Sequence, residues 1–579
     1  MCEKWGQPTL SQGARIGEPT FHPASPVDRA GCPYFSPHAH SGFWLLLGYT
    51  AKIVKRALLF LPLALLAQAP PRLATGFDSI TASDLRADLT FLASDALEGR
   101  MSLERGSEVA IQWIAAEFAK AGLKPIADGS YLQPVPLVEY RADRQLSSLN
   151  LTISGKTETL QATGSYPNDG NYSGKIVFAG FGITAPELDY DDYKSIDAKG
   201  KIVLVFNHEP QEDDAKSIFN GKGNTRYANA RAKMFIAARH GAVAMLVMPD
   251  PNHPKGMVRG PLDNAQARQQ SPRTPRPIQA IADEASIPAF NINAAAAEKL
   301  LPNASAIQSS IDATLKPSSR PLDAEAALHI VNALRKRQLS YNVVGLLEGS
   351  DPALSAETII VSAHYDHEGL AAGGGIYHGA DDNGSGTVGV VALAKAFTKN
   401  PAKPKRSILF NVYAAEERGL LGAYYYAAHP LRPLATTRAV INFDMIGRNE
   451  APSTQTNGLI EIAPDTSNEV NIIGTKYSPD YRATVVKSNE YAGLHLNYKW
   501  DEDTVLSVLF RSDQYPFLMH DIPAMWWFTG FHPDYHQTTD TADKINYAKM
   551  EKILKLAYIS AFDFGDAKNP PKFVPRPAL

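Results

Sequence analysis

Two stretches near residue 100 have apolar residues at helical spacing. In ASDLRADLTFLASDALEGR the apolar positions are Leu85, Leu89, Leu92 and Leu97, and Ser83 is the predicted N-cap. A second helix is predicted in SEVAIQWIAAEFAKAGL, which ends at Gly122. One face of this second helix would carry Ala110, Trp113, Ile114 and Phe118.

From about 150 to 320 the helical pattern gives way to short β-rich pieces, among them KIVFAGFGI, KIVLVFNHE and AVAMLVMPD, which are separated by glycine and proline. This stretch contains no cluster of residue types that bind metals. We interpret 150–322 as an inserted, smaller β-rich domain, because the strands that follow need the earlier helices to cover them.

After Tyr341 the chain alternates strands with helices. Predicted strands include ETIIVSAH, RSILFNVYAAEE, RAVINFDMIG and PAMWWFTG, and several are continuous apolar runs. Such runs are typical of sheets with helices on both faces. The prediction is an α/β fold with a mostly parallel twisted sheet between helices, formed by 78–149 and 323–570.

Composition places the chain among ordinary globular proteins. It has 579 residues, 44% of them hydrophobic and 20% charged, and a net charge of -3. This length is too great for one hydrophobic core, so at least two domains are expected. Without a long basic run, a nucleic-acid partner has no electrostatic support.

The N-terminal region 1–69 is predicted to be absent from the mature protein. Its first fifty residues are rich in Pro, Gly and Ser, and KIVKRALLFLPLALLAQA follows at about 52–69. A basic start, a short apolar run and a small-residue cleavage site form a secretory signal peptide, and the apolar run is too short for a membrane anchor. We therefore expect a protein exported to the periplasm or the medium, not stably inserted in a membrane, with a true start codon near residue 54. Both cysteines, Cys2 and Cys32, lie in this region, which excludes disulfides and thiol chemistry.

Acidic and imidazole side chains follow the ends of four predicted strands. His364, Glu416, Glu417 and Asp444 come at strand ends, His536 lies in the loop after PAMWWFTG, and Asp382 precedes the predicted helix that begins near Gly386. In open α/β sheets, sites form at the carboxyl ends of the strands. Histidines and carboxylates without thiols suit a borderline divalent ion such as Zn²⁺. The groups exceed what one tetrahedral site needs, and if one carboxylate bridges they complete a two-metal site.

Five motifs, in this order, carry a family resemblance: HYD, GADDNGSG, AAEERGLLGA, NFDMIG and DYHQTTDT. Together they resemble the M28 family of co-catalytic zinc aminopeptidases, and the insert is similar to the protease-associated domain of many members. The resemblance implies a zinc-exopeptidase fold, two Zn²⁺ ions and peptide substrates.

The same resemblance implies roles for individual residues. The metal ligands would be His364, Asp382, Glu417, Asp444 and His536. Asp382 would bridge the two ions and precede a cis peptide bond. Asp366 would orient the imidazole of His364, Glu416 would be the general base, and Tyr535 would hydrogen-bond the oxyanion.

Other charged residues near these motifs match no ligand position. His367, His378 and His532 are interpreted as surface or pocket-lining groups. Asp381 is interpreted as a charge beside the site or at a helix N-terminus. Asp513, in the loop SDQYPF, receives no assignment.

Alternatives within the same fold remain open. A glutamate-carboxypeptidase-type enzyme would need an arginine cluster to hold a carboxylate, and the sequence does not place one. A one-metal glutaminyl cyclase and a non-catalytic receptor module are disfavoured by the complete ligand set. A serine hydrolase is excluded because no G-x-S-x-G motif occurs. Side-chain specificity, oligomeric state and the role of the insert are not predicted.

Overall fold

The computed structural model describes residues 69–160, 164–252, 276–456 and 458–576. The chain divides into two units, 1–63 and 64–579, and the second contains all of the described residues. The predicted signal peptide at 52–69 lies outside the described residues except for its last position. Among the residues that are described, no helix combines the length and apolarity that crossing a membrane requires.

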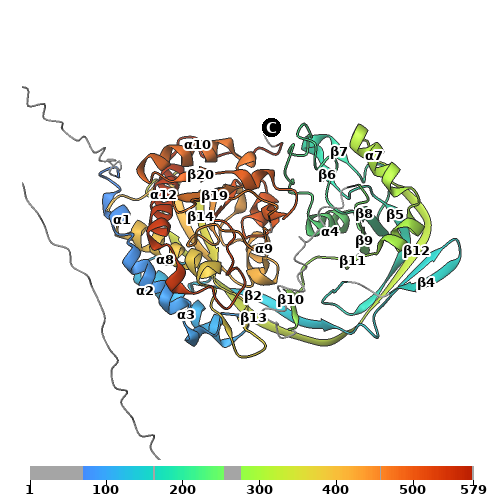
Figure 1. Ribbon diagram of the computed structural model, residues 1–579, viewed down its shortest axis with the longest axis horizontal. Coiled ribbons are helices and arrows are strands. Elements are labelled where there is room, and N and C mark those ends of the chain that lie inside the picture. Colours follow the sequence, from blue (N-terminus) through green and yellow to red (C-terminus); the bar gives the residue numbers. More distant parts are fainter. Residues whose placement is uncertain (1–68, 161–163, 253–275, 457, 577–579) are drawn as a thin grey trace, which may run out of the picture. The chain divides into compact units, whose positions relative to one another are not determined.

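A ten-stranded sheet forms the center of the larger lobe (Figure 1). Its strands, in spatial order, are β10 (Ile278–Ile281), β2 (Leu132–Ala142), β13 (Asn332–Leu347), β17 (Ser407–Tyr413), β14 (Thr358–His364), β18 (Thr437–Phe443), β21 (Ala524–Phe528), β19 (Glu469–Ile473) and β20 (His495–Asn497), with β1 (Lys124–Pro125) beside β13. The α/β class is confirmed, and β17, β14, β18 and β21 are parallel to one another. The flanking pairs β10–β2, β2–β13, β13–β17 and β21–β19 are antiparallel, so the sheet as a whole is mixed rather than mostly parallel.

Helices cover both faces of this sheet. On β14, Ile359 and Val361 belong to one hydrophobic core, whereas Ile360 belongs to the core of the opposite face. This alternation follows from the two-residue period of a strand and explains the continuous apolar run in the sequence. The helices of this lobe are α1 (Ala74–Asp78), α2 (Ala82–Leu92), α3 (Arg105–Lys120), α8 (Gly386–Lys399), α9 (Leu421–Ala428), α10 (Pro479–Ser488), α11 (Tyr515–Leu518) and α12 (Tyr547–Asp566).

The two predicted helices near residue 100 are present as α2 and α3. Thr81, not Ser83, is the N-cap of α2: its backbone is extended and its hydroxyl accepts a hydrogen bond from the Asp84 N–H at 3.2 Å. Ser83 already lies inside the helix, so the predicted cap was wrong by two residues. Gly122 ends α3 as predicted, with a φ of +75° that favours glycine.

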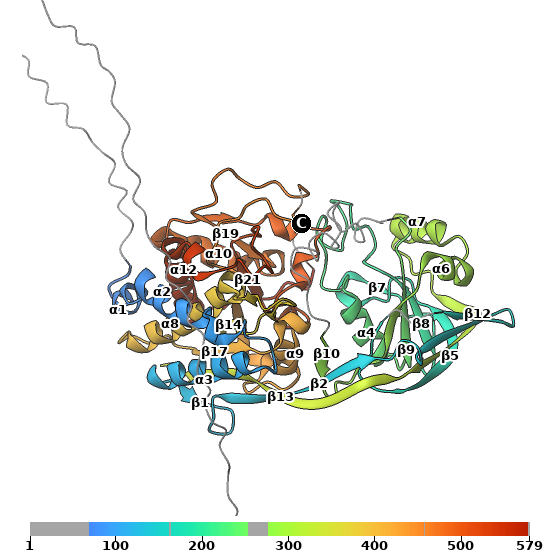
Figure 2. The ribbon, with the colours of Figure 1, turned by 60° about the horizontal axis from the view of Figure 1, so that its bottom comes forward.

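A second sheet of seven strands, with its own hydrophobic core, forms what we call the inserted lobe. Its strands, in spatial order, are β11 (Ala289–Asn291), β9 (Ala244–Met248), β8 (Ile202–Phe206), β5 (Gly170–Phe178), β12 (Arg320–Ile330), β3 (Ser148–Ile153) and β4 (Lys156–Leu160), and its helices are α4 (Ala230–Arg239), α6 (Ala294–Leu300) and α7 (Ala304–Thr314). Although β10 falls within 150–322, it pairs with β2 of the large sheet. Figure 2 shows β2 and β13 side by side along the path between the two sheets. The exact boundaries of an inserted domain stay a prediction.

One arginine of the inserted lobe contacts the larger lobe close to the Glu416-Glu417 pair. Arg231, at the start of α4, donates a hydrogen bond to the main-chain carbonyl of Gly419 at 3.2 Å. Its guanidinium lies 3.9 Å from the ring centroid of Tyr424 in α9 and pairs with Glu284 at 2.6 Å. The inserted lobe therefore supports the turn that begins at Glu416.

Candidate metal centre

The carboxyl ends of the parallel strands bring the predicted ligands together. His364 is the last residue of β14, Asp444 directly follows β18, and Glu417 lies in the turn after β17. Asp382 lies just before α8, and His536 in the loop after β21. The peptide bond between Asp382 and Asn383 is cis, as the resemblance implied. All five predicted ligands fall into two clusters. Within each cluster, the possible ligand atoms lie within 4.8 Å of one another.

The two clusters share one carboxylate. Oδ1 of Asp382 is 3.6 Å from Nε2 of His364, while its Oδ2 is 2.8 Å from Nε2 of His536. Asp444 belongs to the first cluster and Glu417 to the second. A carboxylate that presents one oxygen to each cluster has the arrangement of a bridging ligand in a two-metal site.

The first cluster fits a divalent cation. Nε2 of His364 is fully buried, and the nearest carboxylate oxygens, from Asp444, Asp382 and Glu416, are 3.5, 3.6 and 3.7 Å away. These separations exceed an ordinary hydrogen bond, so the imidazole nitrogen points at three carboxylates without bonding any of them. Nitrogen and oxygen donors converging without thiols suit Zn²⁺.

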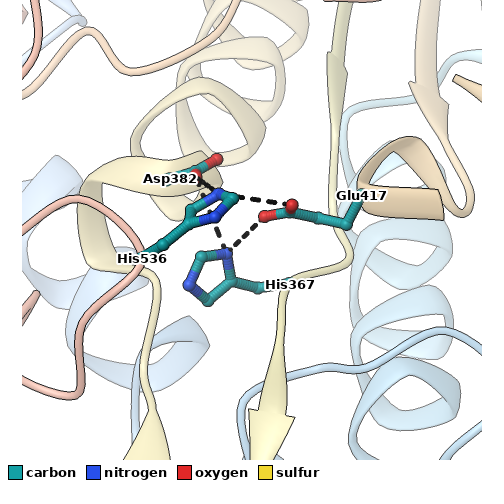
Figure 3. Close-up of side chains that lie close together, drawn as sticks. All are labelled: His367, Asp382, Glu417 and His536. Atoms are coloured by element: carbon teal, nitrogen blue, oxygen red, sulfur yellow. Dashed lines mark hydrogen bonds and ion pairs between the residues drawn. The ribbon is translucent and has the colours of Figure 1, made fainter. Parts of the chain in front are cut away.

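The second cluster contains a histidine that the sequence prediction placed elsewhere. Nδ1 of His367 is 2.8 Å from Oε1 of Glu417 and 3.9 Å from Oδ2 of Asp382 (Figure 3). His367 is fully buried, which corrects its interpretation as a surface or pocket-lining group. His367 lies three residues after His364, beyond the end of β14, where no hydrophobic period marks a position. The motifs that carry the family resemblance gave it no ligand role. His536 completes this cluster, with Nε2 3.3 Å from Oε2 of Glu417.

Asp366 holds the turn that carries the two glutamates. Its carboxylate accepts hydrogen bonds from the N–H groups of Glu416 at 2.9 Å and Glu417 at 3.4 Å. Nδ1 of His364 lies nearer to the main-chain carbonyl of Asp366, at 3.2 Å, than to its carboxylate, at 3.8 Å. Both the main chain and the side chain of Asp366 therefore position other residues of the centre, which is the outer support that metal sites require.

Burial and neighbouring charges separate the two glutamates in pKa. Burial raises the pKa of the Glu416 carboxyl well above its usual value, and Asp444 and Glu417 add to the rise although His364 opposes it. Burial would also raise the pKa of Glu417, but His536 and His367 outweigh it and hold that pKa well below its usual value. Two adjacent carboxyls with opposed pKa shifts are suited to different tasks, proton transfer for Glu416 and metal ligation for Glu417.

Tyr535 lies against the second cluster. Its ring stacks on the imidazole of His536 with centroids 3.9 Å apart, and burial raises the pKa of its phenol. The hydroxyl accepts a hydrogen bond from Nη2 of Arg511 at 3.1 Å. Arg511 was not among the predicted site residues, because it lies 24 positions from Tyr535 in a loop without periodicity.

A buried arginine that sequence reasoning missed ties the ligand loops together. The guanidinium of Arg100 donates four hydrogen bonds to main-chain carbonyls, to Tyr365 at 2.8 Å, Leu92 at 2.7 Å, His378 at 2.7 Å and Gly379 at 2.8 Å. Arg100 is fully buried, and burial lowers its pKa to about 10. The loops that carry His364 and Asp382 are thus joined by a side chain more than 250 positions away.

The remaining residues named from the sequence lie beside the clusters. His378 is half-buried, with Nε2 2.8 Å from Oδ1 of Asp95, in keeping with a peripheral position. His532 is fully buried, with Nε2 3.2 Å from Oδ2 of the equally buried Asp381, so it is neither a surface group nor a ligand of the two clusters. Asp513 is also buried, and its neighbour Ser512 donates to Oδ2 of Asp444 at 2.6 Å.

Parallel strands whose carboxyl ends gather histidines and carboxylates around one shared aspartate form an arrangement that can hold divalent metal ions. Residues 342–559 match Peptidase family M28, and all five motifs lie within this range. The resemblance predicted from the five motifs is confirmed.

Curated relatives are similar over part of the chain. An uncharacterized protein YfbL of Escherichia coli is 29% identical over 34% of this chain and 64% of its own length. Leucine aminopeptidase 2 of Arthroderma otae is 27% identical over 38% of this chain and 43% of its own, and leupeptin-inactivating enzyme 1 of Streptomyces exfoliatus is 29% identical over 35% and 39%. The chain thus spans less than two thirds of the length of these relatives.

Among solved structures, an aminopeptidase from Aneurinibacillus sp. strain AM-1 is similar over 87% of this chain and 98% of its own, at 18% identity and a TM-score of 0.44. A zinc aminopeptidase from Bacillus subtilis is similar over 85% and 97%, at 18% identity and a TM-score of 0.41.

Proposed function

We propose that this protein is a two-zinc aminopeptidase, which hydrolyses the peptide bond next to a free amino terminus. The observation that carries the proposal is the shared carboxylate of Asp382, with one oxygen toward each cluster. The peptidase family supports hydrolysis of peptides, and relatives named leucine aminopeptidase support attack at the N-terminal end.

The donor set divides naturally between two ions. His364 and Asp444 would hold one, Glu417 and His536 the other, and Asp382 both; His367 is placed to hold Glu417 in position or to join the second set. Bound there, two zinc ions would polarise the scissile carbonyl and lower the pKa of water.

The protein's own groups would handle the proton and the oxyanion. Glu416 lies beside both clusters but belongs to neither ligand group, and its raised pKa suits a carboxylate that takes a proton from water and delivers it to the leaving amine. The hydroxyl of Tyr535, held by Arg511, would donate a hydrogen bond to the oxyanion.

Product analysis by mass spectrometry tests this proposal. One peptide with a free amino terminus and its acetylated twin would be incubated with the zinc-loaded protein, with and without a chelator. We expect stepwise loss of N-terminal residues from the free peptide only, stopped by the chelator. Loss of residues from the C-terminal end of both peptides would overturn the aminopeptidase assignment.

Glu416→Gln tests the assignment of the base. General acid–base catalysis contributes about 10²- to 10⁴-fold, so kcat should fall within that range while bound zinc, measured by mass spectrometry, stays unchanged. Glu490→Gln, at an exposed position, is the matched control. A Glu416→Gln enzyme that keeps more than about a tenth of the activity would contradict a role in proton transfer.

A carboxypeptidase is the second candidate, because the structure supplies arginines that the sequence prediction could not place. Arg276 and Arg418 line a pocket beside Glu417. The acetylated peptide separates the two activities, since a carboxypeptidase would shorten it from the C-terminal end.

We also propose that the protein is exported, on the basis of the signal-peptide pattern at about 52–69. N-terminal sequencing of the mature protein should begin close to residue 70. Mature protein that begins before Ala57 would contradict this.

A further inference from the structure

A pocket of about 350 Å³ opens directly beside the second cluster. Its wall is formed by the segment before β10, by the short strands β15 (Gly369–Leu370) and β16 (Ile376–Tyr377), and by the turn after β17. The charged residues of this wall are Arg276, Arg418, Glu368 and Glu417. A substrate whose scissile bond lies at the clusters would place a neighbouring group in this pocket.

Both guanidinium groups are held in place by other residues of the pocket wall. Nη2 of Arg276 donates to the main-chain carbonyl of Leu370 at 2.8 Å, and a Cβ at Gly369 would lie 3.0 Å from its Nη1. Nη2 of Arg418 is 3.3 Å from Oε2 of Glu368, while its Nε is buried without a hydrogen-bond partner among the described residues. Burial lowers the pKa of Arg276, and the charge of Arg418 adds to this, as expected for two cations that face one space.

The carboxylates of the wall are already engaged. Glu417 is paired with His367 at 2.8 Å and His536 at 3.3 Å in the metal cluster. Glu368 is shared between Arg418 at 3.3 Å and Nδ1 of His536 at 3.7 Å. Two guanidinium groups therefore face the pocket while both of its carboxylates are engaged by other residues, which leaves guanidinium N–H groups for a ligand. Arginine binds carboxylates through paired N–H donors, and such bonds are stronger than neutral ones.

The adjoining pocket has an excess of negative charge. It shares Arg276, Pro277 and Leu370 with the first pocket, and its other lining residues include Glu98, Glu104 and Glu139. These carboxylates would repel an anionic group that moved further from the clusters. A negatively charged substrate group is thus favoured beside Glu417 and disfavoured one pocket away.

We propose that Arg276 and Arg418 bind a carboxylate of the peptide substrate next to the scissile bond. The carboxylate is either an acidic side chain or the free C-terminus of a short peptide. This inference rests on the proposed peptidase function and names the substrate class that this site prefers.

Matched acid and amide substrates test the proposal and separate the two sources. The side-chain pairs are Leu-Glu-amide against Leu-Gln-amide and Glu-Leu-amide against Gln-Leu-amide; the C-terminal pair is Leu-Leu against Leu-Leu-amide. For the zinc-loaded enzyme, kcat/KM should favour the acid by about tenfold or more in at least one pair, as expected for a charge-assisted hydrogen bond. In Arg276→Met and Arg418→Met this ratio should fall toward one. Arg239→Met, at an exposed position on α4, should keep the wild-type ratio.

Binding of the same peptides to the zinc-loaded Glu416→Gln protein, measured by calorimetry, gives a readout that does not depend on turnover. If the wild type hydrolyses the amides but no pair favours the acid, the pocket assignment is overturned and the peptidase function stands. If nothing is hydrolysed but the acid binds more tightly and the arginine variants lose that preference, the pocket stands and the proposed function fails. An acid preference that survives both arginine substitutions would overturn the assignment of these residues.

Discussion

Replacing Arg100 with methionine tests whether one buried side chain holds the metal-binding loops together. Methionine keeps much of the length and apolar volume but removes the charge and all four hydrogen bonds to main-chain carbonyls. A buried acceptor that loses its donor costs about 1–3 kcal/mol, while removal of the buried charge returns part of that cost. The expected loss in the free energy of unfolding is therefore about 3–5 kcal/mol, at the upper end for one substitution.

The charges around Arg100 predict how zinc changes this loss. Asp540, Asp382, Asp366 and Glu417 all act on its pKa electrostatically, so the guanidinium offsets a group of carboxylates. Without it, the metal-free protein should suffer from stronger repulsion among these carboxylates. Bound zinc would supply positive charge at the same place, so the loss should be smaller for the zinc-loaded protein.

Urea unfolding of both proteins, with chelator and with excess zinc, measures the effect. Arg105→Met is the control, because that side chain is 69% exposed and makes a surface ion pair with Glu98 at 3.2 Å. A loss below about 1 kcal/mol for Arg100→Met without zinc would refute the reasoning, since it would equal that of an exposed pair. A loss in the free energy of unfolding that grows when zinc is added would refute the proposal that Arg100 offsets repulsion among the nearby carboxylates.

Three further perturbations test other parts of the structure. Asp382→Asn should lower the binding of both zinc ions, whereas Asp444→Asn should weaken one, as measured by zinc content after dialysis. Arg231→Leu removes the contact between the inserted lobe and the turn after the glutamate pair, so kcat should fall severalfold and the thermal midpoint should drop. Glu357→Gln should cost about 1 kcal/mol at neutral pH, because hydrogen bonding from Arg438 lowers the pKa of Glu357 in the folded protein. This stabilisation exists above the unfolded-state pKa and disappears as the pH falls through the folded-state value, so the variants should converge in acid.

Each perturbation has a matched control at an exposed position. Asp480→Asn should keep both zinc ions, Arg239→Leu should keep kcat, and Glu490→Gln should keep the stability of the wild type at every pH. Equal zinc loss in Asp382→Asn and Asp444→Asn would contradict the bridging position. Unchanged kcat in Arg231→Leu would show that the turn beginning at Glu416 keeps its conformation without this contact from the inserted lobe. A difference for Glu357→Gln that grows in acid would reverse the assigned sign.

The sequence alone determined the class of fold and the position of His364, Glu417 and Asp444 at or just after strand ends. A strand buried on both faces is mostly apolar, so β14, β17, β18 and β21 are visible as nearly continuous apolar runs. Parallel neighbours end at the same edge, and a charged residue placed at that point has a foreseeable location. The antiparallel flanking strands were not foreseen, because pairing direction depends on the path of the chain between strands.

Only the tertiary structure selected the residues that support and extend the site. His367 meets Glu417 across 50 positions, Arg100 reaches Gly379 across 279, and Arg276 joins Arg418 at one pocket from separate segments. No periodicity relates such pairs, and arginine and glutamate are most often surface residues, so their types alone do not mark them as part of a site. Their contacts arise from the packing of loops around the sheet edge, and packing over these separations depends on all of the intervening chain rather than on any local pattern.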